Sequence, residues 1–171
     1  INTFTGLKID GAGTLRNPEK HESVRMLLDL LQTMSGDDET SFRFILNWLA
    51  WPLKHLGAKL RSCLVVKGAQ GVGKSLVFSH VMRSIYGEDG TPGRVWAGVI
   101  GQSELVSSFN AWMSQRLYLV AEEVTTAFNV KETANRLKAL ITEPHITINT
   151  KHMPVRLEEN HANLVFISNE A

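Results

Sequence analysis

A run of eight residues from Gly68 to Ser75, Gly-Ala-Gln-Gly-Val-Gly-Lys-Ser, has the composition and spacing of a phosphate-binding loop. Its glycines let the backbone turn so that successive N–H groups point at an anion. The lysine can reach the β- and γ-phosphates, and the Ser75 hydroxyl can bind Mg²⁺. We therefore predict a site for ATP and Mg²⁺, formed by Gly68, Ala69, Gln70, Gly71, Val72, Gly73, Lys74, Ser75 and Leu76.

The sequence on either side of this loop supports the prediction. The apolar run Leu64-Val65-Val66 comes before it, as expected of a central parallel strand, and a helical pattern from Lys74 to about Tyr86 follows. A helix in that place adds the positive end of its dipole to an anion site. The alternative, a fortuitous glycine-rich turn, lacks a reason for both flanking elements.

Two adjacent carboxylates, Glu122 and Glu123, follow the apolar run Leu117–Ala121. If this run is a strand of the same parallel sheet, its carboxyl end lies at the edge where the loop lies. We expect Glu122 to hold the Mg²⁺ shell and Glu123 to orient and deprotonate the attacking water. The two roles could be exchanged, and a pair of solvated acids in a loop is the plain alternative.

A third apolar run, Leu164–Ile167, ends in Ser168 and Asn169. If this strand lies beside the strand that precedes the phosphate loop, the Asn169 amide reaches the γ-phosphate and the water. An ordinary loop asparagine is the alternative. With Lys74 and Glu123, Asn169 completes the predicted catalytic set.

Strand-like runs alternate with helical patterns after residue 60, which predicts an α/β fold with a parallel sheet. We expect a strand at Val95–Ile100, a helix marked by Leu105, Phe109 and Trp112, and a helix at Lys131–Thr142. An alternating segment, Ile146–Leu157, indicates a hairpin. The core is therefore assigned to residues 61–171.

Residues 1–60 are assigned to an N-terminal arm and a small helical collar. One helix opens at Pro18 and ends at Ser35-Gly36; a second follows an acidic cap and ends at Gly57. Trp48 and Trp51 on the second helix are interpreted as packing residues rather than a base-stacking face.

The composition describes one globular domain and excludes several classes of protein. The 171 residues are 43% hydrophobic and 20% charged, with a formal net charge of +1, so any nucleic-acid contact must be local. The single cysteine excludes an internal disulfide.

The most apolar stretch, residues 44–56, is interrupted by Pro52, and no signal peptide is evident, so we expect a cytoplasmic protein without a membrane segment. Because the sequence opens at Ile1 and stops after a strand-like run, we also expect a fragment of a larger protein.

Taken together, these motifs resemble the superfamily 3 (AAA+) helicases of phages and plasmids, in particular the helicase domains of primase-helicases. The resemblance extends from about residue 42 to residue 170, and the hairpin followed by a strand ending in asparagine is its most specific part. Local similarity lies in residues 45–53, 110–112, 137–142, 146–151 and 163–169.

This resemblance implies a ring-forming P-loop NTPase, usually a homo-hexamer, that hydrolyses ATP and pulls single-stranded DNA through its centre. It implies that Lys151 and His152, at the hairpin tip, hold the DNA, and that a primase-polymerase domain lies upstream. From the residues alone, Lys151 is a solvent-facing cation able to neutralise a phosphate, or an ordinary charged turn. The family's arginine finger would follow the last strand, beyond residue 171, and the isolated chain would then hydrolyse ATP poorly.

Three alternatives stay open at this stage. The chain could be an AAA+ ATPase that loads or remodels a protein partner without moving on DNA. It could be a P-loop phosphotransferase, although Arg94 is the one arginine in the Gly-rich segment that would have to form a lid. It could also be only a nucleotide-binding or assembly module. Arg136 and Lys138 are expected on a solvated helix face, with a neighbouring subunit's nucleotide as the alternative contact.

Overall fold

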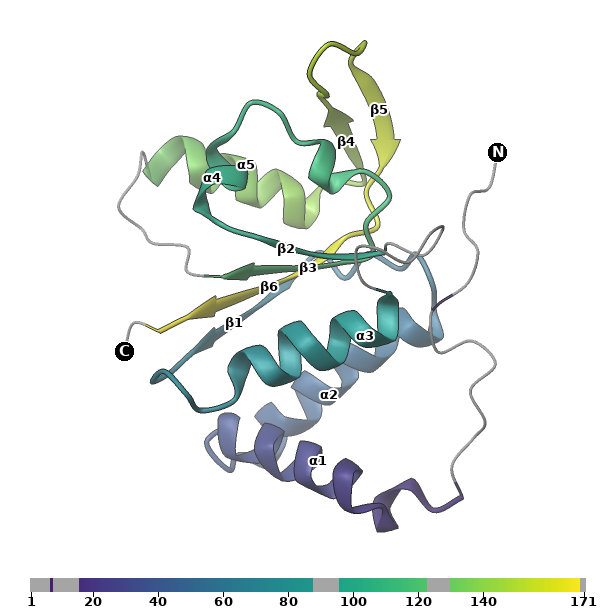
Figure 1. Cartoon of the computed structure of the whole chain (residues 1–171), viewed down its shortest axis with the longest axis vertical. Coiled ribbons are helices and arrows are strands. Elements are labelled where there is room, and N and C mark those ends of the chain that lie inside the picture. The colour runs from purple at the N-terminus through teal and green to yellow at the C-terminus, as the bar shows by residue number, and fades with distance from the viewer. Residues whose placement is uncertain (1–6, 8–15, 88–95, 123–129, 170–171) are drawn as a thin grey trace.

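A four-stranded parallel sheet forms the centre of the protein (Figure 1). The computed structural model describes residue 7 and residues 16–87, 96–122 and 130–169. The sheet has the order β1-β6-β3-β2 and is built from β1 (Cys63–Lys67), β2 (Ala97–Ile100), β3 (Tyr118–Glu122) and β6 (Asn163–Ser168). The predicted α/β class with a parallel sheet is confirmed, and each predicted strand forms within a few residues of its expected bounds. The expected central position is wrong for β1, which is an edge strand with Val65 60% exposed.

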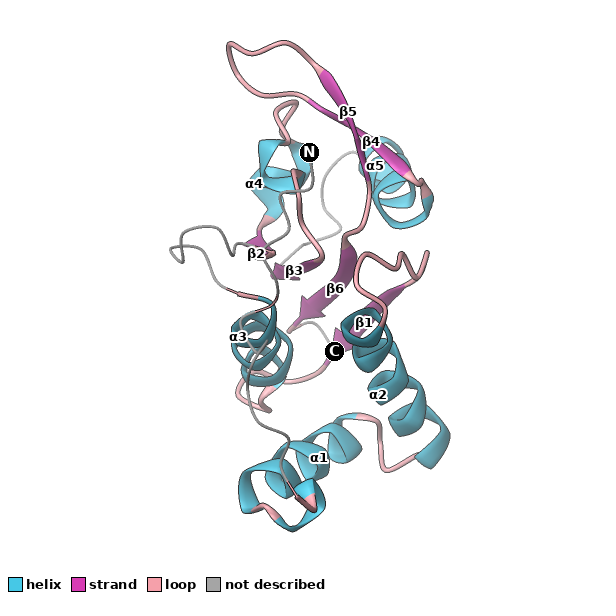
Figure 2. Ribbon diagram, turned by 90° about the vertical axis from the view of Figure 1, so that its right-hand side faces the viewer, coloured by secondary structure: helices cyan, strands magenta, loops and turns pink. Residues whose placement is uncertain are grey.

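Helices cover both faces of this sheet (Figures 1 and 2). On one side lie α1 (Glu22–Met34), α2 (Glu39–Lys54) and a helix after the phosphate loop, composed of the π-helical η2 (Leu76–Val81) and α3 (Met82–Tyr86). On the other side lie α4 (Gln102–Val106), the short η3 (Ala111–Met113) and α5 (Val130–Thr142).

Side chains of β3 alternate between two hydrophobic cores, one on each face of the sheet. Tyr118 and Val120 belong to the cluster beneath α1, α2 and α3, whereas Leu119 and Ala121 belong to the cluster beneath α4 and α5. All four side chains are at most 1% exposed. Successive strand residues point to opposite faces, so a strand buried on both sides is apolar throughout, as predicted.

The hairpin stands apart from the central sheet (Figure 1). Its strands, β4 (His145–Ile148) and β5 (Arg156–Glu159), pair antiparallel and form a sheet of their own. Ile148, the β4 residue nearest the turn, is completely buried in the α4–α5 cluster and packs the hairpin against it. The predicted hairpin is confirmed.

The two collar helices form where the capping residues predict. The Asp38 carboxylate accepts the Ser41 N–H at 2.7 Å, which satisfies an open donor at the start of α2. Gly36 and Gly57 follow the ends of α1 and α2 with φ of +70° and +83°, values that favour glycine. A short 3₁₀ turn, η1 (Pro18–Lys20), precedes α1.

The two tryptophans of α2 differ from one another. Trp48 is 5% exposed and donates its indole N–H to Ser62 Oγ at 3.0 Å, so the predicted packing role is confirmed. Trp51 is 52% exposed and lies against the His55 ring, with 4.1 Å between ring centroids. The packing interpretation was wrong for Trp51 because it lies on the outward side of α2.

The single helix expected across Leu105, Phe109 and Trp112 does not form. The α4 helix ends at Val106 and η3 begins at Ala111, with Phe109 44% exposed between them. Asparagine and serine side chains compete with a helix by bonding to backbone groups. Here Asn110 bonds to the hairpin backbone, 37 to 39 residues away, which the local apolar spacing does not reveal.

None of the helices that the structure describes combines the length and the apolar character needed to cross a membrane.

Candidate functional site

The predicted phosphate loop connects β1 to the helix that follows. Gly71 and Gly73 adopt φ of +86° and +90°, so the turn depends on residues without a Cβ. A Cβ added at Gly68 would stand 3.7 Å from Val72 Cγ2 and 4.0 Å from Lys74 Cδ, across the inside of the loop. The loop therefore closes tightly around the lysine side chain.

Lys74 lies at the centre of this loop. Its side chain is buried, with 4% exposure, and its ammonium donates to the carbonyl oxygens of Gly68 and Ala69, each at 2.7 Å. Buried charges need partners, and the loop supplies them from its own backbone. Ser75 follows directly, is exposed, and begins the helix in αR geometry.

The first collar helix contacts the loop from outside. A Cβ at Gly73 would come within 3.0 Å of Leu30 Cδ2 and 3.3 Å of Met34 Cε, both on α1. The loop is thus held between the sheet and α1, and its conformation is coupled to the packing of the collar.

The strand order brings the predicted site residues to one edge of the sheet. Strand β6 pairs with β1 on one side and β3 on the other, all parallel. Ile167 is the register partner of both Val66 and Glu122, and Ser168 is the partner of Lys67. Asn169, the next residue, therefore stands beside the start of the phosphate loop. The prediction for Asn169 required its strand to lie beside the strand that precedes the phosphate loop, and β6 does pair with β1.

Glu122 is half-buried at the end of β3 and faces the helix after the loop. Its Oε1 accepts the Ser79 hydroxyl at 2.7 Å. Glu123, the predicted general base, lies outside the described residues. The structure thus gathers the loop residues 68–76, Glu122 and Asn169 at one edge, and the role of Glu123 stays a prediction.

Sequence reasoning missed Ser79. It is 3% exposed and directly follows the apolar residues Leu76–Phe78 of the helix. A serine at the end of an apolar run, four residues after Ser75 and so about one helical turn from it, was the available signal. Its carboxylate partner is 43 residues away and leaves no local trace.

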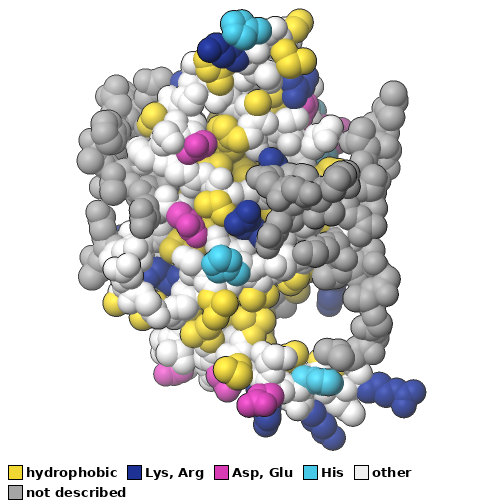
Figure 3. All heavy atoms as spheres, viewed as in Figure 1, with side chains coloured by type: hydrophobic (Ala, Val, Ile, Leu, Met, Phe, Trp, Pro, Cys, Tyr) yellow, Lys and Arg dark blue, Asp and Glu magenta, His cyan; other side chains and the backbone are white. Residues whose placement is uncertain are grey.

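Lys151 and His152 lie in the turn of the hairpin and are both exposed. His152 has a φ of +64°, and the Met153 N–H donates to the Thr150 carbonyl oxygen at 3.1 Å, which closes the turn. Figure 3 shows a lysine or arginine and a histidine side chain at the hairpin end of the molecule, beside hydrophobic ones. The hairpin projects from the sheet on the side away from the phosphate loop, so these residues form a separate candidate site (Figure 1).

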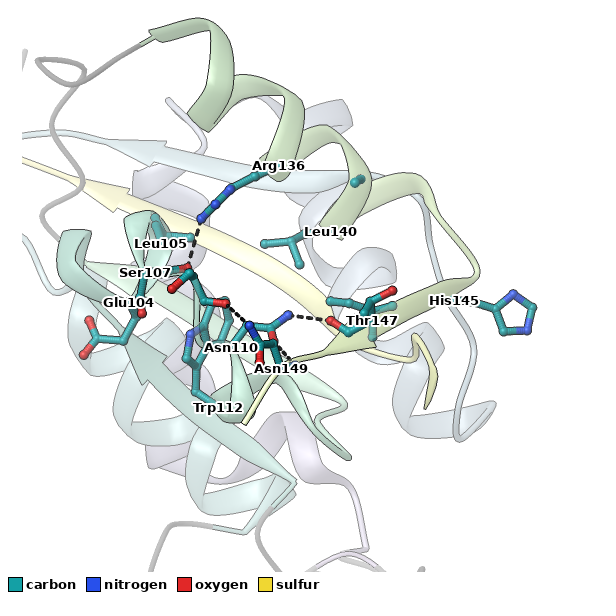
Figure 4. A pocket seen from close by; sticks show the side chains of 13 residues that line it. Glu104, Leu105, Ser107, Asn110, Trp112, Arg136, Leu140, His145, Thr147 and Asn149 are labelled. Carbon is teal, nitrogen blue, oxygen red and sulfur yellow. Dashed lines mark hydrogen bonds between the residues drawn. The ribbon is translucent and has the colours of Figure 1, made fainter. Parts of the chain in front are cut away.

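Asn110 fixes the β4 side of the hairpin (Figure 4). Its Oδ1 accepts the Asn149 N–H at 2.7 Å, and its amide donates to the Thr147 carbonyl oxygen at 2.9 Å. The backbones of Asn110 and Asn149 are also bonded, and the Asn149 amide donates to the Ser108 carbonyl oxygen at 3.1 Å. These bonds join the hairpin to the segment between α4 and η3.

Ser114 fixes the β5 side. Its hydroxyl contacts both carboxylate oxygens of Glu158, at 2.9 and 3.0 Å, and lies 3.0 Å from Arg156 Nη2. Arg156 Nε is 2.6 Å from Glu158 Oε1, which closes the cluster. The hairpin is therefore attached through both of its strands to one short stretch, residues 107–114.

Arg136 lines a cavity of about 420 Å³ between this stretch, α5 and β4 (Figure 4). Its Nη1 donates to the carbonyl oxygens of Val106 and Ser107, at 3.2 and 2.9 Å, at the end of α4. The expected solvated position is wrong for Arg136, because the open carbonyls of a helix end attract a cation. Lys138 is exposed as expected.

Lys59 lies at the base of the hairpin. Its ammonium donates to the carbonyl oxygens of Leu140, at 2.7 Å, and Ala162, and lies 3.3 Å from Asn160 Oδ1. Burial lowers the pKa of Lys59 to about 8. This one side chain links the α2–β1 connection, the end of α5 and the start of β6.

Known proteins resemble the chain over most of its length. A family profile, described as a family of unknown function and designated DUF5906, matches residues 66–171, more than half of the chain. The match includes the last two residues of β1, the phosphate loop, Glu122, the hairpin and Asn169. The chain belongs to the DUF5906 family.

A DNA primase-polymerase of Nitratiruptor phage NrS-1 is 28% identical over 152 residues. The alignment covers 87% of this chain and only 20% of that protein, so the chain spans about one fifth of the relative. An apo structure of the NrS-1 C-terminal region matches with a TM-score of 0.74 and 28% identity, over 85% of this chain and 34% of that one. A second apo structure of the same region matches with a TM-score of 0.72 and 26% identity, over 86% and 33%. The chain is thus similar to the C-terminal region of a phage DNA primase-polymerase.

Proposed function

We propose that this DUF5906 chain is the ATP-hydrolysing core of a DNA replication protein and acts as a helicase motor on single-stranded DNA. The observation that carries the proposal is the position of β6 between β1 and β3. This order brings the phosphate loop, Glu122 and Asn169 to one edge of the sheet, where a P-loop NTPase needs its phosphate-binding, metal-binding and γ-phosphate-contacting groups.

The residues at this edge fit a nucleoside triphosphate with Mg²⁺. The loop closes through two glycines at positive φ. The buried ammonium of Lys74 lies within it and donates to two backbone carbonyl oxygens. A cation held in that position can transfer its hydrogen bonds to phosphate oxygens. The hydroxyl of Ser75 and the carboxylate of Glu122 are hard oxygen ligands of the kind that Mg²⁺ prefers.

Each side chain then has one task in hydrolysis. Bound Mg²⁺ would supply charge neutralisation at the phosphates. Lys74 binds the β- and γ-phosphates, Ser75 and Glu122 hold the metal shell, and Asn169 contacts the γ-phosphate and the attacking water. Glu123 accepts the proton of that water.

The hairpin supplies the DNA contact in this proposal. Lys151 and His152 project from a turn that is attached through Asn110 and Ser114 to the core, so a force on the tip is transmitted to the body of the domain. Contacts from a lysine to phosphates are independent of sequence, which suits movement along a strand. A homo-hexameric ring would bring several such hairpins into one channel, and each weak contact would then add to the others.

The likeness to the C-terminal region of a DNA primase-polymerase supports the replication role and suggests a primase-polymerase domain upstream. The test uses the full-length protein. We expect ATP hydrolysis that depends on Mg²⁺ and is stimulated by single-stranded DNA, together with a ring-sized particle when ATP, Mg²⁺ and DNA are present. Hydrolysis that ignores DNA, with no DNA-dependent particle, would instead favour an ATPase that remodels a protein partner.

A further inference from the structure

Two hydrogen bonds attach the helix after the phosphate loop to β3. The Ser79 hydroxyl donates to Glu122 Oε1 at 2.7 Å, and the Tyr118 hydroxyl donates to the Phe78 carbonyl oxygen at 2.8 Å. Tyr118 and Glu122 are the first and last residues of β3 and lie on the same face of the strand. Consecutive helix residues are therefore bonded to the two ends of one strand.

This attachment coincides with a π-helical segment. The six residues Leu76–Val81 form π-type turns, whereas the flanking residues are α-helical. π-helical turns are rare and frequently occur at functional sites, because the wider turn redirects side chains and frees backbone groups. Here the segment carries both bonded residues, Phe78 and Ser79.

The Ser79 hydroxyl donates its proton to the Glu122 carboxylate and not to the helix backbone. A buried serine in a helix commonly donates to the carbonyl four residues earlier, which here would be that of Ser75. A hydroxyl has a single proton to donate, so the bond to Glu122 takes the place of that bond. Ser79 is also one helical turn from Ser75 on the same face, so the carboxylate it holds lies about one turn from the hydroxyl predicted to bind Mg²⁺.

We propose that Ser79 is a positioning residue for the metal: by fixing Oε1 of Glu122, it orients the carboxylate toward the Mg²⁺ that accompanies ATP. This inference rests on the proposed function, because it requires a Mg·ATP site at this edge of the sheet. Groups that bond to a metal-binding carboxylate set its direction, and their removal typically lowers metal affinity by about 10- to 100-fold.

The test compares Ser79→Ala with Tyr118→Phe in the whole protein. Both variants remove one hydroxyl bond between the π-helical segment and β3, but only Ser79→Ala releases Glu122. ATP binding is measured by calorimetry across a Mg²⁺ titration and in EDTA. We expect Ser79→Ala to raise the Mg²⁺ concentration for half-maximal enhancement by about tenfold, with binding in EDTA unchanged, and Tyr118→Phe to leave that midpoint at the wild-type value.

The outcomes separate the inference from the proposed function. A wild-type midpoint in Ser79→Ala, a lower midpoint, or equal shifts in both variants would overturn the positioning role while leaving the Mg·ATP site in place. Absence of Mg²⁺-dependent ATP binding by the wild type would overturn both. If Ser79→Ala does not fold, Ser79→Cys keeps a small side chain with a weak donor, and a raised midpoint is again the supporting result, an unchanged one the opposing result.

Discussion

The ammonium of Lys74 lies 2.7 Å from the carbonyl oxygen of Gly68, six residues earlier in the chain. This bond spans the whole width of the phosphate loop, from its first residue to the start of the helix. The cation is therefore held inside the loop by backbone carbonyls. Under the proposed function, phosphate oxygens would compete for the same donor, so that loop conformation and phosphate affinity would both depend on this side chain.

Lys74→Ala is expected to lower the affinity for ATP at least tenfold. The loss is that of a charge-assisted hydrogen bond or more, about 1.5–3 kcal/mol. Calorimetry of wild type and variant gives the two dissociation constants. Lys67→Ala is the matched control, since it removes an exposed lysine at the end of β1 and outside the loop. Equal affinity for ATP in wild type and Lys74→Ala would contradict the assignment of the loop.

Glu122→Gln and Glu123→Gln should have different effects in the whole protein. Glu123→Gln keeps the side-chain size but cannot accept a proton, so turnover should fall by about a hundredfold or more while Mg·ATP binding is retained. Glu122→Gln should instead raise the Mg²⁺ concentration needed for binding. The measurement is steady-state hydrolysis beside a Mg²⁺ titration of ATP binding. The reverse pattern would exchange the two roles.

The sheet and the edge residues could be predicted because the signals are local. The runs Leu117–Ala121 and Leu164–Ile167 are apolar throughout, as buried parallel strands are, and polar residues follow each of them, so Glu122 and Asn169 were recognisable as strand ends. The positive φ of Gly71 and Gly73 follows from the loop pattern itself. Only the order of the strands, which decides whether those ends meet, required the structure.

The contacts that could not be predicted all join distant segments. The sequence of the helix does not distinguish α- from π-helical turns, so the π-helical η2 could not be predicted. The bond from Ser79 to Glu122 could not be predicted either, because the two residues are far apart in the sequence. Asn110 interrupts a helix because its hydrogen-bond partners lie on the hairpin. Arg136 was expected to face solvent, but it donates to a carbonyl oxygen at the end of α4. In each case tertiary hydrogen bonds decided between local alternatives.

Lys59 makes the stability of the protein depend on pH in an identifiable direction. Its pKa is lowered from 10.5 to about 8 in the folded state by burial. Between these values the unfolded chain binds the proton and the folded chain releases it, so the free energy of unfolding should rise with pH from about 8 toward 10.5. Chemical denaturation at several pH values between 7 and 9.5 measures this slope.

The comparison with Lys59→Met isolates that contribution. Burial raises the pKa values of Cys63 and Tyr118, which opposes the rise at the alkaline end, but both groups are present in wild type and variant. Lys59→Met should therefore show a smaller increase in stability with pH, or a decrease. It should also be less stable at pH 7, because the carbonyls of Leu140 and Ala162 lose their donor. Identical pH slopes for the two proteins would show that Lys59 does not titrate in this range.

The last prediction concerns the hairpin tip. If Lys151 and His152 contact DNA, the double variant Lys151→Ala/His152→Ala should bind single-stranded DNA more weakly for every sequence tested. Its salt dependence should be flatter, since fewer counterions are released when fewer phosphates are neutralised. ATP binding should be unchanged, because the hairpin projects away from the phosphate loop.

The assay is DNA binding by the assembled whole protein at two salt concentrations, with His145→Ala as the matched control. His145 is an exposed residue at the base of the same hairpin, so its variant keeps the fold and the tip. The hairpin itself should remain in place in both variants, because Asn110 and Ser114 attach it through residues outside the tip. Equal affinity and equal salt slope for wild type and the double variant would refute the DNA-contacting role of the tip. The function would then be better described as remodelling of a protein partner by the same ATPase edge.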